Sequence, residues 1–335
     1  MNDAATIKAA PEKTALALEH KHERPLTACH WNPQSRFIFF GAEDNLVHRL
    51  DLTNRTAISL AAHDSWVRSF ASSPDGATLY SGGYDGRLGF WPATDEKPQP
   101  IRMVTAHEGW LRAIAVSHDG KHVATCGNDR LVRLWDAKDG TAVKEFKGHT
   151  SHVYNIAFTQ DGSSIVSCDH KGMVIAWSVA TGEKRDVASV DALHEYDTTF
   201  RADIGGARGI AVHRNGAQVA LGGITNVTNA FAGVGEVAIA LVNLADGKVE
   251  RVLQSKGKKK GCIWGVAHHE DGFWIGLSGG GGGWLMFWKG DTDHEFHSLQ
   301  LKNDGRGMSL SPDRTQLAVA HGDNHLRTYT LYEKA

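Results

Sequence analysis

Several features that mark particular classes of protein are scarce or absent in this sequence. Only 4 of the 335 residues are cysteines, and none belongs to a Cys-x-x-Cys pair, so neither a disulfide framework nor a zinc motif is expected. No apolar run approaches the roughly 20 residues of a membrane-spanning helix, and the first residues contain no apolar secretory core. Together these absences predict a cytoplasmic protein with no membrane segment.

Charge of one sign and proline are scarce as well. The formal net charge is only −2, which argues against nucleic acid or an anionic membrane as the partner. One basic run, from Lys256 to Lys260, is expected to be a solvated surface loop, with contact to an acidic partner as the alternative. The 8 prolines against 37 glycines favour a chain with many tight turns.

The most informative feature that is present is an internal repeat. A histidine, an Asp-Gly turn and a tryptophan recur in the same order three times, and each marker advances by 44 and then by 42 residues. The histidines are His63, His107 and His149, the turns begin at Asp75, Asp119 and Asp161, and the tryptophans are Trp91, Trp135 and Trp177. Repeats of roughly 40–45 residues with this chemistry are typical of four-stranded propeller blades.

The turn between the first two strands of each unit extends the repeat over the whole chain. It recurs at Gln34, Asp75, Asp119, Asp161, Asn215, Asp271 and Asp313. Seven units follow, with blades expected at approximately residues 22–60, 61–104, 105–147, 148–205, 206–254, 255–301 and 302–335. The last unit is one strand short, whereas residues 14–20 alternate like a strand, after a segment 1–13 that is expected to be flexible. The sequence therefore predicts an all-β fold, a single seven-bladed β-propeller closed by an N-terminal strand that completes the last blade.

These residues resemble those of the WD-repeat β-propellers, and the resemblance covers nearly the whole chain. The third unit matches best, with His107, Thr125, Asp129 and Trp135 followed by Asp136. The resemblance implies that histidine, hydroxyl, aspartate and tryptophan form a buried hydrogen-bond chain within a blade. An unpaired buried polar group costs about 1–3 kcal/mol, so these histidines are expected to be structural.

The other units carry this set of residues to different degrees. The second supplies His63, Ser81, Asp85 and Trp91. The fourth has His149, Ser167 and Trp177, but Lys171 stands at the aspartate position, so its chain is expected to be incomplete. The first and last units have Leu50 and Tyr329 where tryptophan is expected, and the fifth and sixth match mainly by turns and strands.

Motifs for catalysis or ligand chemistry are not found. The glycine run Gly279 to Gly283 has no following lysine or helix, so a loop between strands is expected, with anion binding as the lesser alternative. His294 and His297 lack the spacing of a helical zinc site, and a Ser-His-Asp triad cannot be argued from spacing alone. The sequence therefore predicts no catalytic residue, no cofactor and no metal site.

A second repeated position lies at the start of each innermost strand. The position occurs once in each unit, at Thr27, Arg68, Arg112, Tyr154, Arg208, Trp264 and Arg306, so four of the seven residues are arginines. Trp66 lies two residues before Arg68, and Trp110 lies two residues before Arg112. The resemblance implies that these positions surround the upper mouth of the central channel, where partners usually bind. Arginine grips carboxylate or phosphate in a bidentate way, and arginine and tryptophan are enriched at binding hot spots.

Two interpretations of this rim remain open. In the first, Arg68, Arg112, Tyr154, Arg208, Trp264, Arg306, Trp66 and Trp110 bind an acidic or phosphorylated protein segment. In the second, the arginines pair internally, for example Arg306 with Asp304 or Glu43, and the two tryptophans only pack between blades. In a propeller, loops that enter the first strand of a blade and loops that join its second and third strands emerge on one side. Four unusual loops of these kinds, namely residues 191–206, residues 224–235, the lysine run and the glycine run, are therefore expected beside the arginines, and loops on rigid scaffolds often carry function.

The leading functional prediction is a non-enzymatic scaffold or adaptor that binds a protein or peptide partner on the upper face. The alternative is a small anionic ligand binder, or an enzyme, that uses the channel mouth. A nucleic-acid binder would need a wider basic surface than the net charge suggests. Because one fold serves many functions, the adaptor prediction depends partly on the family resemblance.

Overall fold

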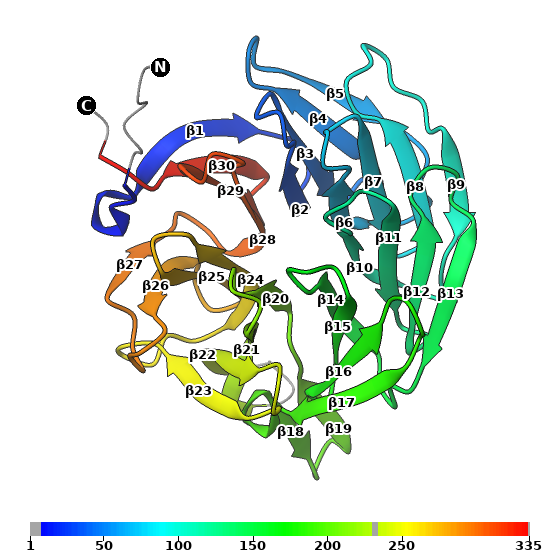
Figure 1. Cartoon of the computed structure of the whole chain (residues 1–335). Helices are drawn as coiled ribbons and strands as arrows, with labels where there is room; N and C mark the ends of the chain where they lie inside the picture. Colours follow the sequence, from blue (N-terminus) through cyan, green and yellow to red (C-terminus); the bar gives the residue numbers. More distant parts are fainter. Residues whose placement is uncertain (1–7, 230–233, 334–335) are drawn as a thin grey trace, which may run out of the picture.

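The computed structural model describes residues 8–229 and 234–333, and these form seven four-stranded antiparallel sheets arranged around a central channel (Figure 1). Blade 1 consists, from the channel outward, of β2 (Leu26–Trp31), β3 (Phe37–Ala42), β4 (Val47–Asp51) and β5 (Thr56–Leu60). Blade 2 consists of β6 (Val67–Ser72), β7 (Thr78–Gly83), β8 (Arg87–Pro92) and β9 (Arg102–Thr105). Blade 3 consists of β10 (Leu111–Val116), β11 (His122–Gly127), β12 (Leu131–Asp136) and β13 (Ala142–Lys147).

The remaining blades follow the same order. Blade 4 consists of β14 (Val153–Phe158), β15 (Ser164–Asp169), β16 (Met173–Ser178) and β17 (Lys184–Ser189). Blade 5 consists of β20 (Gly209–Val212), β21 (Gln218–Asn229), β22 (Val234–Asn243) and β23 (Val249–Gln254). Blade 6 consists of β24 (Cys262–His269), β25 (Phe273–Gly279), β26 (Trp284–Lys289) and β27 (His297–Gln300).

Blade 7 joins the two ends of the chain. Its inner strands are β28 (Gly305–Leu310), β29 (Gln316–His321) and β30 (His325–Thr330), and its outer strand is the N-terminal β1 (Ala15–Lys21), which pairs antiparallel with β30 (Figure 1). Before β1, the short helix η1 (Pro11–Lys13) follows Ala10, whose N–H donates to the carbonyl of Leu331 at 2.6 Å. Residues 1–7 of the expected flexible segment lie outside the described residues.

The core lies between neighbouring blades, because each sheet packs against the next around the ring. The second strand of blade 1, β3, is buried at all six positions, as expected for a short apolar run covered on both faces. The outer strand β13 instead has exposed residues at four of its six positions. Phe37 and Phe39 of blade 1 pack in one cluster with Val67 and Leu79 of blade 2, so the sheets are held together mainly by apolar burial.

Both lengthened units carry regular structure. Residues 191–206 contain helix η2 (Asp191–Leu193) and a separate two-stranded hairpin of β18 (His194–Asp197) and β19 (Ala202–Gly205). The other insertion extends β21 and β22 beyond the neighbouring blades' strands, and residues 230–233 at its tip lie outside the described residues. Throughout the described residues, no helix has the length and apolar character needed to cross a membrane.

A buried polar chain links the strands of blade 3. His107 Nδ1 lies 2.8 Å from Asp129 Oδ1, and its Nε2 lies 2.8 Å from Thr125 Oγ1, which also accepts the Trp135 indole N–H at 2.9 Å. Blade 2 has the same contacts among His63, Ser81, Asp85 and Trp91. Although burial opposes ionisation, the hydrogen bond from His107 helps to lower the pKa of Asp129 to about 2.

The expectation of an incomplete chain in blade 4 is wrong. Lys171 does stand at the expected aspartate position, but Asp169 supplies the carboxylate, with Oδ2 3.0 Å from His149 Nδ1. The rest of the chain is present, since Ser167 Oγ lies 2.7 Å from His149 Nε2 and accepts the Trp177 indole N–H at 2.8 Å. Blade 4 therefore closes the same chain with an aspartate two residues earlier.

The backbone position explains how Asp169 can replace the later aspartate. Asp169 ends its strand where Gly127 ends the corresponding strand of blade 3. A Cβ atom built on Gly127 would lie only 2.8 Å from His107 Nδ1. This position is thus directly beside the imidazole, and a carboxylate placed here reaches the ring without the help of the following turn.

Candidate partner-binding site at the channel mouth

Six of the seven rim positions share a backbone irregularity that redirects their side chains, whereas Arg208 lies directly before its strand, β20. In six blades the pairing of the innermost strand skips the rim residue, as at Arg68 between Val67 and Ser69, and at Arg112 between Leu111 and Ala113. The same shift occurs at Thr27, Tyr154, Trp264 and Arg306. A β-bulge leaves one residue unpaired and redirects its side chain, so the bulges account for the ring of side chains at the mouth.

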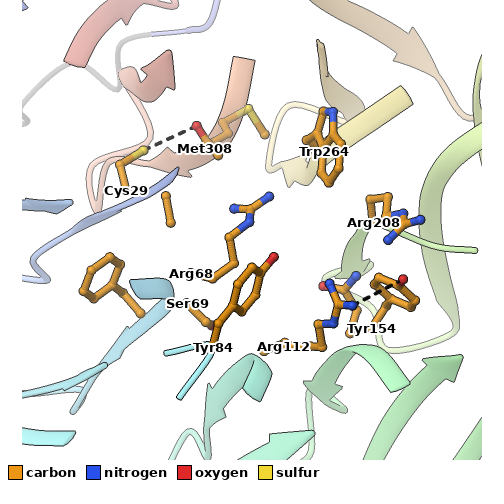
Figure 2. Close-up of a pocket in the computed structure, with 14 residues that line it drawn as sticks. Cys29, Arg68, Ser69, Tyr84, Arg112, Tyr154, Arg208, Trp264 and Met308 are labelled. Atoms are coloured by element: carbon orange, nitrogen blue, oxygen red, sulfur yellow. Dashed lines mark hydrogen bonds between the residues drawn. The ribbon is translucent and has the colours of Figure 1, made fainter. Parts of the chain in front are cut away.

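Three rim arginines converge on one space, together with aromatic rings (Figure 2). The guanidinium carbon of Arg208 lies 3.9 Å from the ring centroid of Tyr154, and that of Arg112 lies 4.4 Å from the same centroid. Arg68 lies 5.4 Å from the centroid of Trp264, which Arg208 also approaches at 5.7 Å. Cations near ring faces are stabilised by the ring quadrupole, so the aromatic residues hold the arginines in place without neutralising them.

None of these three arginines forms an ion pair among the described residues, and two of them donate side-chain hydrogen bonds to neutral groups. Arg68 donates to the carbonyl of Thr27, and Arg112 Nε donates to Asn128 Oδ1 at 2.7 Å. We call Arg68, Arg112 and Arg208 the arginine ring. Because no carboxylate neutralises them, the ring concentrates positive charge at the mouth of a chain whose net charge is negative.

The internal-pairing interpretation holds for the fourth rim arginine. Arg306 Nη1 lies 2.6 Å from Glu43 Oε1, across the boundary between blades 7 and 1. Asp304 instead accepts the backbone N–H of Gly282 at 3.0 Å. Arg306 is therefore matched by a carboxylate and contributes less to the positive potential than the arginine ring does.

The effect of the concentrated charge is visible in neighbouring groups. Burial lowers the pKa of Arg68, and the nearby charges of Arg112 and Arg306 act in the same direction. Burial also lowers the pKa of His170 to about 4, with a further contribution from the charge of Arg208. Adding an anion would relieve this repulsion, so the site has a physical reason to take one.

Two cavities lie along the channel and share the arginine ring as lining. One of about 180 Å³ also touches Ser69, Asn155 and Met308, and another of about 340 Å³ extends toward Glu43, Trp66 and Arg306. Both are further lined by Tyr84 and Trp264. The same charged groups thus face a deeper pocket and the open mouth.

Two rim tryptophans present aromatic surface beside this mouth. Trp110 stacks on Tyr84 with ring centroids 4.2 Å apart and nearly parallel planes, and the ring centroid of Trp66 lies 6.4 Å from that of Tyr84. Their exposed fractions are nevertheless 43% and 40%. The tryptophans pack between blades as one interpretation expected, and they also leave large apolar faces in solvent.

Tyr84 and Asn128 are site residues that the sequence interpretation missed. Tyr84 follows directly after the second strand of blade 2, and Asn128 occupies the same place in blade 3. The sequence does contain a signal for them, because both residues come directly after a strand that ends in glycine. Their roles depend on which neighbouring blade they face, and this is visible only in the assembled ring.

The four unusual loops are brought together in part. The glycine run touches the lysine run, since a Cβ on Gly281 would lie 2.6 Å from the carbonyl carbon of Lys260, and Gly280 lines the wider cavity. Two lysines are paired internally, Lys259 with Glu295 at 2.6 Å and Lys260 with Glu236 at 3.5 Å. Among the described residues of the four loops, only the glycine run lines a cavity that the arginine ring also lines.

The buried chains reproduce the order of groups in a hydrolytic triad without its surroundings. Ser81, His63 and Asp85 lie in hydroxyl, imidazole and carboxylate order, at 2.8 and 3.0 Å. Ser81 is fully buried, however, and its hydroxyl oxygen also accepts the Trp91 indole N–H at 2.8 Å. Ser81 lines neither channel cavity, so the arrangement serves the blade.

Comparison with known families agrees with this geometry. The model of the WD domain, G-beta repeat, matches residues 54–92, 98–136 and 140–178. No curated protein matched the chain. The three matched repeats and the seven blades around one channel are consistent with a WD-repeat β-propeller. Propellers of this family generally serve as scaffolds for protein interactions and are typically non-enzymatic.

Proposed function

We propose that this propeller is a scaffold or adaptor that binds an acidic or phosphorylated protein segment at its channel mouth. The observation that carries the proposal is the arginine ring, three guanidiniums around one cavity with no carboxylate partner in residues 8–229 and 234–333. Guanidinium forks match carboxylate and phosphate oxygens in pairs. A bound anionic side chain would supply the charge that the ring lacks.

The exposed tryptophans favour a protein segment over an isolated anion. Trp66 and Trp110 lie beside the ring and offer rigid apolar surface on which a chain can rest. Aromatic anchors next to arginine are a common composition of binding hot spots. A segment with one acidic group over the cavity and apolar neighbours on the tryptophans fits both features.

A small anionic ligand is the second candidate, because the deeper cavity of about 180 Å³ has the volume of several waters. This candidate predicts that a small anion such as inorganic phosphate stabilises the protein in a saturable way and that Trp66 and Trp110 are dispensable. The adaptor proposal predicts that replacing these tryptophans weakens the binding of a protein partner.

A cytoplasmic location is also proposed. The four cysteines are free, with Cys29, Cys126 and Cys168 buried and Cys262 half-buried. Unpaired cysteines fit a reducing compartment, where disulfides are rare.

The test is affinity capture from source-cell lysate with wild type and the double variant Arg112→Ala, Arg208→Ala. The matched control is Lys121→Ala, Arg214→Ala, which removes two positive charges from exposed turns between first and second strands. We expect the ring variant to lose specific proteins that the control retains. Identical sets of captured proteins from all three would contradict the proposal.

A further inference from the structure

Blade 1 holds a cluster of potential metal ligands outside the channel. His22 Nε2 lies 3.1 Å from Asp44 Oδ2, and His48 Nε2 lies 3.1 Å from both carboxylate oxygens. One ligand atom from each of the three residues lies within 4.8 Å of the others. His22 precedes β2, Asp44 lies in the turn between β3 and β4, and His48 belongs to β4, so three separate segments converge on one point.

The cluster stands where blades 2 and 3 have their polar chain. His22 lies four residues before its innermost strand, as His63 and His107 do, and Asp44 lies two residues after the second strand, as Asp85 and Asp129 do. In blades 2 and 3 both ring nitrogens of the histidine are used, one by the aspartate and one by a hydroxyl.

Two substitutions in blade 1 change this arrangement. Phe40 occupies the place of the hydroxyl residue, since it pairs with His48 as Thr125 pairs with Arg133 in blade 3. Leu50 occupies the place of the tryptophan. The polar hydrogen-bond chain of blade 1 therefore does not continue to a hydroxyl and an indole. The carboxylate of Asp44 contacts two imidazoles instead.

The surroundings orient the imidazoles of this cluster. The ring of Phe40 stacks on His48 with centroids 4.8 Å apart and meets His22 edge-on at 5.6 Å. His48 Nδ1 lies 3.0 Å from Ser59 Oγ. A hydroxyl can donate or accept, so Ser59 can hold His48 with Nε2 free for a metal, and such outer contacts are usual for metal-bound histidines.

We propose that His22, Asp44 and His48 form a Zn²⁺ site of two histidines and one carboxylate, with water as the fourth ligand. The donor set is one that zinc takes, with bonds of about 2.0–2.2 Å to nitrogen and oxygen. Tetrahedral bonds of this length place ligand atoms roughly 3.3 Å apart, close to the His-to-Asp separations of 3.1 Å. The side chains of His22 and Asp44 are 15% and 23% exposed, which gives an ion access from solvent.

The position gives such a site a structural consequence. His22 directly follows β1, the strand that closes the ring, whereas Asp44 and His48 belong to the second half of blade 1. A bound ion would therefore fasten the closing strand to blade 1. Zinc should then raise the melting temperature of the protein, since a ligand bound only to the folded state stabilises that state.

The experiment measures zinc retained by metal-stripped protein after addition of Zn²⁺ and gel filtration, with elemental analysis, and the dissociation constant by calorimetry. Wild type should retain one zinc per chain. Asp44→Asn and His22→Gln each remove a ligand and should weaken zinc binding by more than about 100-fold. Ser59→Ala removes only the contact that orients His48 and should weaken binding by roughly 10–100-fold. The melting temperature should rise with zinc in wild type but not in Asp44→Asn or His22→Gln.

The matched control is His20→Gln, because His20 lies close enough to His22 for the charge of His22 to lower the pKa of His20, but is not one of the three. It should bind zinc as wild type does. Circular dichroism of the metal-free proteins checks folding, and the partly exposed His22 offers a variant that does not disturb the core. Wild type that retains no more zinc than Asp44→Asn, or a His20 variant that loses it equally, would overturn the proposal.

Discussion

Blades 2 to 4 and blades 5 and 6 reach the same strand arrangement through different side-chain chemistry. In blade 3, Thr125 and Trp135 belong to the buried polar chain. At the matching positions blade 6 has Gly276 and Trp288, and the Trp288 indole N–H donates to the carbonyl of Gln254 at 2.8 Å. The polar chain is thus one solution among several for filling the same volume and satisfying an indole N–H.

Blade 5 takes the difference further. Its matching residues are Leu221 and Val242, both fully buried within the apolar packing between blades 4 and 5. The family model matches three segments that each end in the third strand of blade 2, 3 or 4. The comparison teaches that a unit is recognised from its sequence when it carries the residues of the polar chain. The blade itself requires only a well-packed interior.

The largest expected effect comes from breaking the chain of blade 4. Asp169→Ala removes a fully buried carboxylate that accepts from His149 and from two backbone N–H groups. Removal of one partner of a buried pair leaves the other unpaired, so we expect a loss of about 3–5 kcal/mol in the free energy of unfolding by urea titration.

Lys171→Ala is the matched control for this prediction. Lys171 stands at the family's aspartate position, but its side chain forms only a half-exposed pair with Asp203. Its removal should change the free energy of unfolding by less than about 0.5 kcal/mol. Equal losses in the two variants would contradict the assignment of Asp169.

A smaller loss is expected from adding a side chain in blade 6. A Cβ on Gly276 would lie 2.8 Å from the Trp288 ring, so Gly276→Ala should cost about 1–3 kcal/mol through overpacking. Thr125→Ser in blade 3, which keeps the hydroxyl, should cost less. If Gly276→Ala left the free energy of unfolding unchanged in urea titration, a side chain would fit at this position. Lack of space beside Trp288 would then not explain why blade 6 has no buried polar chain.

The smallest effect in this series depends on pH. Burial lowers the pKa of His268 in blade 6 from 6.5 to about 4, with contributions from His213 and Arg314. The unfolded chain therefore takes up the proton first, and stability falls as pH drops from 6.5 toward 4, by up to about 1.4 kcal/mol per pH unit. His268→Phe should flatten the difference between unfolding at pH 7 and at pH 5.

His118→Phe is the control, because His118 is exposed in a turn of blade 3. It should leave the pH dependence as in wild type. The carboxylate of Asp129 in blade 3 adds a separate contrast, since its stabilising contribution is lost only as pH falls from 3.8 toward about 2. A His268 variant with the wild-type pH profile would show that this histidine is not the titrating group.

The sequence was sufficient for features that repeat. The period of the histidine, turn and tryptophan markers predicts the blades, and counting back from each turn finds Arg68, Arg112 and Arg208 at one level. What it could not predict depends on contacts between segments. The role of Asp169 follows from the backbone that lies beside the His149 ring. The choice of Glu43 over Asp304 as the partner of Arg306 follows from the meeting of blades 7 and 1, which joins residues 263 positions apart.

The arginine ring is tested most directly by the dissociation constant of the partner most enriched by capture, measured for wild type, the ring variant and the control pair. We predict that Arg112→Ala, Arg208→Ala weakens binding by about 30-fold or more, or about 2 kcal/mol, as expected for hot-spot residues. Lys121→Ala, Arg214→Ala should bind as wild type does. Equal dissociation constants for wild type and the ring variant would contradict binding at the channel mouth.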